Sequence, residues 1–307
     1  MKPILFDTHT HFNFNAFKDD WEKVIERTLE KNIWFVNVGA EAKTSERAVN
    51  IALKYPKGVY AAAGLHPIHT YDDEICRNRA LPCSNRTESC SYAEEFDKNF
   101  YAGLIKKSKK VIALGEIGLD YFHIKKFSYI LNKKLKAKQA EVFIEQIKLA
   151  EKYKKPIIIH CRPDKDCDAY REILDILKDT RKMLLDPRFR GDDRRSKDNN
   201  SLSGIVHCFQ ANIKILEQFI SYGFMIGYNG VITFTDQYDE LVKATPLEKI
   251  VLETDAPWLA PLPYRGKRNE SLYVAEVAKR IAELKNISYE EVADRTTENA
   301  MRIFKLI

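Results

Sequence analysis

The stretch 4-ILFDTHTHF-12 begins as a buried strand and ends in two histidines, His9 and His11. Its first residues are apolar on both alternating faces, which is typical of a parallel strand that is covered on both sides. Such a strand is expected to end at a turn residue such as glycine or asparagine, whereas this one ends at imidazoles. Because alternate residues of a strand project to the same side, we expect His9 and His11 to reach one metal ion together.

Seven further apolar runs resemble the first one, and segments with helical spacing separate them. In 138-KQAEVFIEQIKLAEKY-153, for example, apolar residues recur at a period of about 3.6. Alternating strands and helices predict a parallel sheet, and eight strands favour an α/β fold of the closed eight-stranded TIM type. An open doubly wound sheet is the alternative, although no GxGxxG follows the first strand. The further expected strands are 33–40, 59–67, 111–120, 157–161, 204–209, 224–232 and 250–257.

The 307 residues are interpreted as one barrel domain, 1–307, because single barrels of this kind commonly reach about 250 residues or more. The pattern at 288–304 predicts an extra C-terminal helix that closes one face of the barrel. Two polar, aperiodic stretches, 76–91 and 181–203, are expected to be surface insertions. The arginine-rich run 188–197 in the second stretch has five basic residues, and the four aspartates in and beside it nearly cancel them, which argues against a dedicated nucleic-acid arm.

Charge and cysteine content place only loose bounds on function. The net charge of +6 at pH 7 is compatible with an anionic partner but does not require one. Six cysteines without a CxxC pair indicate reduced thiols, so we expect a cytoplasmic protein. Separately, we expect a monomer. A zinc site at Cys76, Cys83 and Cys90 is a minor alternative, because their spacing is not a usual zinc pattern. Neither a signal peptide nor a long apolar span is evident, so no membrane partner is expected.

Residues with metal-ligand chemistry stand at the C-terminal ends of the expected strands. In a barrel these ends share one face, so residues far apart in the sequence meet around one mouth. A single histidine there is usually an ordinary hydrogen-bonded residue. Six ligand-type side chains are harder to explain that way, because burying them without partners would be costly. The expected metal ligands are His9, His11, Glu116, His160, His207 and Asp255.

The order of the strands divides these ligands between two divalent ions. Strands eight and one are neighbours in a closed barrel, so Asp255 can complete the shell of the ion held by the first two histidines. His160 and His207 come from adjacent strands and can hold a second ion, with Glu116 as the bridge. Histidine ligands suit Zn²⁺, and carboxylate-rich sites also take Mg²⁺ or Mn²⁺. Two ions about 3.5–4 Å apart can activate a water for phosphoryl displacement, so Glu116, as the carboxylate between them, would take part in catalysis.

His66 and Arg265 are the expected substrate contacts. His66 follows the third expected strand. The six expected ligands already fill the coordination shells of both ions, so we interpret His66 as a phosphate contact. A structural turn histidine is the alternative. Arg265 lies just after the eighth expected strand, and its guanidinium suits a phosphate fork, with a solvated loop as an equal alternative. Cys161 and Cys208 each follow a ligand histidine, so side-chain alternation predicts core residues rather than nucleophiles.

These motifs together resemble the TatD-type deoxyribonuclease family of the amidohydrolase superfamily. They stand in the family's order and cover nearly the whole chain outside the two insertions. The resemblance implies a metal-dependent barrel hydrolase that cleaves phosphodiester bonds in DNA, often as a 3′-to-5′ exonuclease on single strands. It also implies the same six ligands and a catalytic role for Asp255, which would orient a metal-bound water. The matching stretches are 7-DTHTHF-12, 64-GLHP-67, 115-GEIGLDY-121, 156-PIIIHCR-162, 207-HCF-209, 252-LETDAPWLAP-261 and 265-RGKRNE-270.

Several positions depart from the family's usual pattern, and they leave the substrate open. Cys161 follows the ligand histidine where the family usually has serine, Gln210-Ala211 replaces the common Ser-Gly, and Ser271 stands where proline is usual. Some relatives are assigned as D-aminoacyl-tRNA deacylases, and the same ligands would serve that ester hydrolysis or an RNA substrate. A catalytically silent nucleic-acid-binding protein is the alternative outside the enzymes, and the presence of all six ligands argues against it.

Overall fold

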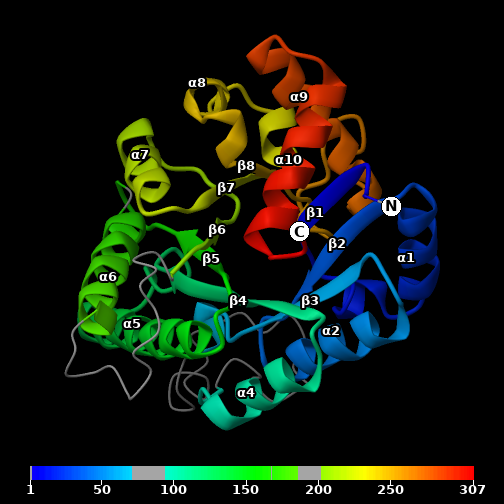
Figure 1. Ribbon diagram of the computed structural model, residues 1–307. Coiled ribbons are helices and arrows are strands. Elements are labelled where there is room, and N and C mark those ends of the chain that lie inside the picture. The colour runs from blue at the N-terminus through cyan, green and yellow to red at the C-terminus, as the bar shows by residue number, and fades with distance from the viewer. Residues whose placement is uncertain (1, 71–93, 167, 186–201) are drawn as a thin grey trace.

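The computed structural model describes residues 2–70, 94–166, 168–185 and 202–307. Eight parallel strands close into a barrel in chain order, with β1 paired to β8, so the predicted barrel is confirmed and an open sheet is excluded. Figure 1 shows the strands as a ring with helices around it. The strands are β1 Leu5–Thr10, β2 Ile33–Val38, β3 Val59–Ala63, β4 Val111–Asp120, β5 Ile157–Arg162, β6 Gly204–Val206, β7 Met225–Tyr228 and β8 Ile250–Leu252.

Amphipathic helices cover the outside of the barrel, and several begin at a side-chain cap. Asp97 accepts hydrogen bonds from the first backbone amides of α4, and Ser288 accepts one from Glu291 at the start of α10. The helices are α1 Trp21–Glu30, α2 Ala42–Lys54, α4 Lys98–Lys107, α5 Tyr129–Lys152, α6 Asp168–Leu185, α7 Ile213–Ser221, α8 Asp239–Ala244, α9 Val274–Lys285 and α10 Tyr289–Ile303, with 3-10 turns η1 Asn15–Phe17, η2 Pro67–His69, η3 Gly230–Thr233, η4 Leu247–Lys249 and η5 Ser271–Tyr273.

An apolar layer fills the end of the barrel opposite the strand ends that carry polar residues. Phe6, Ile158 and Val251 come from different strands and belong to one buried cluster with Met301 and Phe304. The last two residues come from the C-terminal end of α10, which lies across this end of the barrel in Figure 1. The expected C-terminal helix at 288–304 is therefore present, and it closes the barrel opposite the site.

The two predicted insertions fall largely outside the described residues. The stretch 76–91 lies there completely, and so does most of 181–203. The first part of the second stretch differs from the expected loop, because α6 continues as a helix to Leu185. Met183 and Leu184 are half-buried and extend the apolar face of that helix through a segment whose charges had suggested a loop. Among the described helices, none combines the length and apolar character that would let it cross a bilayer.

Candidate metal centre

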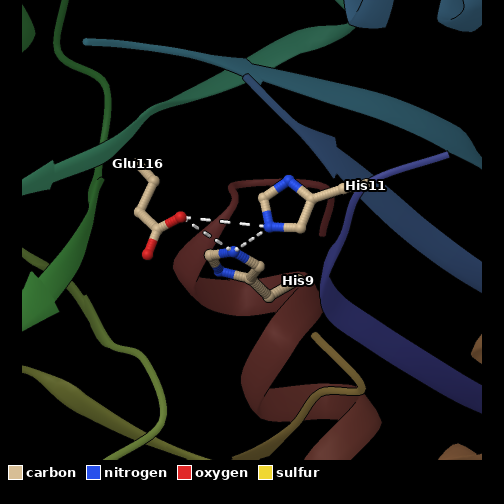
Figure 2. A group of neighbouring side chains, drawn as sticks. All are labelled: His9, His11 and Glu116. Carbon is tan, nitrogen blue, oxygen red and sulfur yellow. Dashed lines mark hydrogen bonds and ion pairs between the residues drawn. The ribbon is translucent and has the colours of Figure 1, made fainter. Parts of the chain in front are cut away.

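The first group of ligand atoms lies where β1 ends. His9 is fully buried, and its Nε2 atom lies 3.1 Å from Nε2 of His11. Figure 2 shows both rings turned toward one carboxylate oxygen, Oε2 of Glu116, at 3.4 Å from His9 and 3.9 Å from His11. Oδ1 of Asp255 approaches from the β8 side, 3.4 Å from Nε2 of His11 and 3.8 Å from Nε2 of His9. These four side chains form one side of the centre.

The second group faces the other oxygen of the same carboxylate. Oε1 of Glu116 lies 2.7 Å from Nδ1 of His160 and 3.1 Å from Nε2 of His207. His160 belongs to β5, and His207 directly follows β6, so neighbouring strands supply this pair. The structure therefore brings all six expected ligands together, with Glu116 between two histidine groups.

Irregular strand pairing helps to aim two of these ligands. The register between β1 and β2 shifts between Asp7 and Thr10, on either side of His9. The register between β4 and β5 also shifts across Glu116. Phe6 points into the barrel interior. In a regular strand, residues three positions apart lie on opposite faces, so His9 would point outward if the strand were regular. Local irregularities of this kind re-aim side chains and are common beside active sites.

Asp7 fastens the end of β1 to the loop after β8. Its carboxylate is fully buried and accepts hydrogen bonds from the Thr254 amide at 3.0 Å, the Thr254 hydroxyl at 2.6 Å and the Ser271 hydroxyl at 2.5 Å. Burial raises the pKa of Asp7 to about 7, although these hydrogen bonds oppose the shift. The Asp255 amide donates to the His9 carbonyl at 2.9 Å, so the two strand ends that carry ligands are held in fixed relation. Ser271, a departure from the family pattern, takes part in this fastening.

The donor set fits a divalent metal centre. His9, His11 and Glu116 each offer a ligand atom within 4.8 Å of the other two. The same holds for the group of Glu116, His160 and His207. Neutral imidazole nitrogen and carboxylate oxygen are the donors that Zn²⁺ takes and that Mn²⁺ and Mg²⁺ also accept. Bringing these polar groups together in a buried position costs desolvation free energy, and a bound cation would offset that cost.

Protonation in the absence of ions follows from the same contacts. Burial disfavours the ionised form of Glu116, but His207 and His9 outweigh that effect and hold its pKa well below the usual range. Burial also disfavours protonated His160, yet hydrogen bonds to Asp120 and Glu116 raise its pKa to about 9. Against the same effect of burial, neighbouring carboxylates raise the pKa of His207 well above its usual value. Bound cations would take the place of these protons, because a metal binds the deprotonated ligand.

Asp120 and Glu253 are buried in the same centre, although the sequence analysis did not select them. Oδ2 of Asp120 lies 3.1 Å from Nε2 of His160 and 2.7 Å from Nδ1 of His123. Burial opposes its ionisation, but the bonds from these two histidines hold the pKa of Asp120 well below its usual range. Glu253 lies 3.2 Å from Nδ1 of His207. Asp120 ends β4, and that position at a strand end was the signal that could have revealed it.

The two expected substrate contacts have different positions. His66 is buried, its Nε2 atom lies 3.7 Å from Oε1 of Glu116, and its Nδ1 atom accepts the amide of Ile68 at the start of η2. It therefore both caps a turn and faces the centre. Arg265 donates to the Ala260 carbonyl and stacks over Phe234 at 4.0 Å from the ring centre. The residues that line the pocket do not include Arg265.

A pocket of about 1110 Å³ opens above the ligands. Phe14 and Trp258 form an edge-to-face pair on one wall, beside His11, and Trp258 is 49% exposed. Lys43 and Arg47 line the pocket from α2 and form no salt bridge with another described residue. On another wall, Arg162 stacks over Phe122 at 4.3 Å from the ring centre. The pocket thus combines an acidic and imidazole floor with aromatic and cationic walls.

The two cysteines beside the candidate ligand histidines differ in burial. Cys161 is buried, and Cys208 is half-buried, and both reach the pocket wall. Burial raises the pKa of Cys208 to about 11, so its thiol stays protonated near neutral pH. The expected core role therefore describes Cys161 better than Cys208.

Comparison with known proteins gives consistent relatives along the whole chain. Residues 6–305 match the family model described as TatD related DNase. The chain is 35% identical over 306 residues to the uncharacterized metal-dependent hydrolase YabD of Bacillus subtilis, covering 99% of this chain and 100% of that protein. It is 27% identical over 312 residues to the 3′-5′ ssDNA/RNA exonuclease TatD of Erwinia tasmaniensis, covering 98% of this chain and 100% of that protein. The crystal structure of YjjV, a TatD homologue from Escherichia coli, superposes with a TM-score of 0.74 at 25% identity, covering 99% of each chain.

Proposed function

Because the chain belongs to the TatD-related DNase family, we propose that it is a metal-dependent hydrolase that cleaves phosphodiester bonds in DNA. The observation that carries this proposal is the buried carboxylate of Glu116, whose two oxygens face separate groups of histidines. That arrangement suits two ions that share one ligand, as in many enzymes that hydrolyse phosphate esters. The relative named as a 3′-5′ ssDNA/RNA exonuclease supports an exonuclease mode on single strands.

The six ligands would hold two divalent ions, Zn²⁺, Mn²⁺ or Mg²⁺. His9, His11 and Asp255 belong to the first ion, and His160 and His207 to the second, with Glu116 shared between them. When bound, such ions supply positive charge for the phosphate oxygens and acidify a water molecule.

Asp255 is the residue that we assign to orient the attacking water and to accept its proton. Its side chain is 17% exposed and lines the pocket, so it can reach a substrate from the floor. Burial opposes its ionisation, but the hydrogen bond from His11 and nearby positive charge lower the pKa of Asp255. The carboxylate is therefore ionised near neutral pH, as a proton acceptor must be. His66, which follows β3 and faces Glu116 from the start of η2, would contact the phosphate.

The walls of the pocket favour a nucleic-acid strand as the substrate. Lys43 and Arg47 can neutralise phosphates of the strand beyond the scissile bond. Trp258 and Phe14 offer exposed ring surface for stacking of an unpaired base, which binds bases of any sequence. A double helix keeps its bases stacked on one another, so these rings suit single strands best.

The test uses protein that is stripped of metal and then supplied with Mg²⁺, Mn²⁺ or Zn²⁺ in turn. Single-stranded DNA labelled at the 5′ end is the substrate, with an RNA strand of the same sequence beside it and His160→Ala as the inactive control. A metal-restored ladder that shortens from the 3′ end, and that the control lacks, is the expected result. No cleavage with any of the three ions would contradict the proposal, and D-aminoacyl-tRNA would then be the next substrate to examine.

A further inference from the structure

A second buried carboxylate, Glu253, lies behind the metal ligands. It directly follows β8 and is fully buried. Its Oε1 atom accepts hydrogen bonds from the Cys208 amide at 2.6 Å and from Nδ2 of Asn229 at 3.1 Å. Its Oε2 atom is buried and has no hydrogen-bond partner among the described residues. A buried carboxylate oxygen without a partner is costly, so its retention here calls for a physical reason.

Two imidazole nitrogens nearby lack partners as well. Nδ1 of His9 and Nδ1 of His207 are buried without a hydrogen bond among the described residues. The two rings stack with centres 4.0 Å apart and an interplanar angle of 22°. His9, His207 and Glu253 each offer an atom within 4.8 Å of the other two, and Nδ1 of His207 lies 3.2 Å from Oε1 of Glu253.

The other nitrogen of each ring is directed to the metal side. Nε2 of His9 lies 3.4 Å from Glu116, and Nε2 of His207 lies 3.1 Å from the same carboxylate. Each histidine therefore presents Nε2 to the shared ligand and leaves Nδ1 for a group behind it. Glu253 is the buried carboxyl group in that position.

The backbone of β7 leaves room for this carboxylate. A Cβ atom at Gly227 would lie 2.3 Å from Oε2 of Glu253 and 3.3 Å from Cα of His207. Any side chain at position 227 would therefore displace the carboxylate. This close approach is an observation separate from the unpartnered atoms. It indicates that the glycine at position 227 makes the space that the Glu253 carboxylate occupies.

We propose that Glu253 is a positioning carboxylate shared by both halves of the metal centre. It accepts the Nδ1 protons of His207 and His9, which keeps both Nε2 atoms unprotonated and aimed at the ions. A carboxylate behind a ligand histidine fixes the tautomer and raises the basicity of the metal-binding nitrogen. His9 belongs to one proposed ion and His207 to the other, so Glu253 couples the two sites. The inference rests on the proposed metal-dependent function.

The test compares Glu253→Gln with wild-type protein in binding of Mn²⁺, followed by calorimetry and elemental analysis. A glutamine has nearly the same shape, but only one of its ends can accept an N–H. We expect two ions per chain in both proteins and a weakening of both binding steps by about 10- to 100-fold. Gly227→Ala should weaken both steps too, because it crowds Oε2 while leaving Glu253 in the sequence. Glu270→Gln is the matched control, since Glu270 is a buried carboxylate paired with Arg27 and Arg268.

A spectroscopic signature separates positioning from simple structural support. In ¹⁵N NMR of histidine-labelled protein loaded with Zn²⁺, Glu253→Gln should change the Nδ1 signals of two histidines, and the control should not. Loss of one ion with the other unaffected would overturn the inference, because Glu253 would then be a ligand of a single site. Unchanged Mn²⁺ affinity, with only a lower melting temperature, would also overturn it. These outcomes do not depend on DNA cleavage, so failure of the proposed nuclease activity would be recognised separately.

Discussion

At the scale of single residues, Glu116 connects the two halves of the centre. Each of its oxygens has a different set of imidazole neighbours, and the group is buried. Ionising a carboxylate at such a depth is unfavourable unless positive charge surrounds it. The histidines supply that charge in the absence of ions, and bound cations would supply it otherwise.

We expect Glu116→Ala to lower kcat on single-stranded DNA by about 100-fold or more, because the ligand shared by the two sites is lost. Metal content should fall as well, while the circular dichroism spectrum stays that of a folded barrel. Glu283→Ala, at a mostly exposed position of α9, is the control and should behave as wild type. Full activity of Glu116→Ala would rule out the shared-ligand arrangement.

His66 allows a second test at this scale. We expect His66→Ala to raise KM for DNA by about tenfold, the loss of one charged or polar phosphate contact, with little change in metal content. Steady-state kinetics and elemental analysis of the same preparation would measure both quantities. Loss of bound metal would instead assign His66 to the ligand shell, together with Asp120 and His160, which lie near it.

At the scale of elements, α10 closes the end of the barrel opposite the ligands. Phe304, at the end of this helix, packs against Phe6 of β1 with ring centres 5.8 Å apart. Both residues belong to the apolar layer at this end of the barrel. The helix therefore contributes to stability, and the strand ends on the other side are free to carry polar chemistry.

Phe304→Ala should lower the free energy of unfolding by about 3–5 kcal/mol, because it leaves a cavity in a fully packed layer. Urea denaturation would measure the change. Ile307→Ala is the control, since Ile307 is 75% exposed and its loss should cost no more than about 0.5 kcal/mol. At temperatures where Phe304→Ala is folded, its kcat should equal that of wild type, and a large loss of kcat there would contradict this separation of roles.

At the scale of the whole molecule, the pocket brings cations from α2 over a floor of ligands from distant strands. The net charge of +6 is spread over the chain, so affinity for a nucleic acid depends on which cations face the pocket. Lys43 and Arg47 both line it. Each contact to a phosphate of a single strand adds about 0.7 to the slope of log affinity against log salt.

Removing both cations, in the inactive His160→Ala background, should therefore reduce that slope by about 1.4 and weaken binding at low salt. Fluorescence anisotropy with labelled single-stranded DNA over a series of salt concentrations would measure it. The control removes Lys243 and Lys279, which lie on α8 and α9 and do not line the pocket. An equal reduction in both proteins would show that general charge, and not the pocket, binds the strand.

The sequence by itself determined the barrel and the convergence of six ligand-type side chains at its mouth. Strand and helix periods are local properties, and a buried parallel strand is visible as a short apolar run. In a closed barrel the strand ends share a face, so ligand-type residues at those ends were bound to meet. Asp120 also ends a strand, β4, but only Glu116 was expected as a ligand from that strand. The contacts of Asp120 with His160 and His123 are visible only in the folded chain.

Only the tertiary structure decided which atoms face one another. The register shifts in β1 and β4 turn His9 and Glu116 into the barrel, and a strand pattern cannot show such shifts. Glu253 has room beside His207 because β7 places Gly227, which has no side chain, next to its carboxylate. Arg265 stacks on Phe234 and does not line the pocket. These contacts join residues from different strands, so they depend on the register and closure of the whole barrel, which short stretches of sequence do not encode.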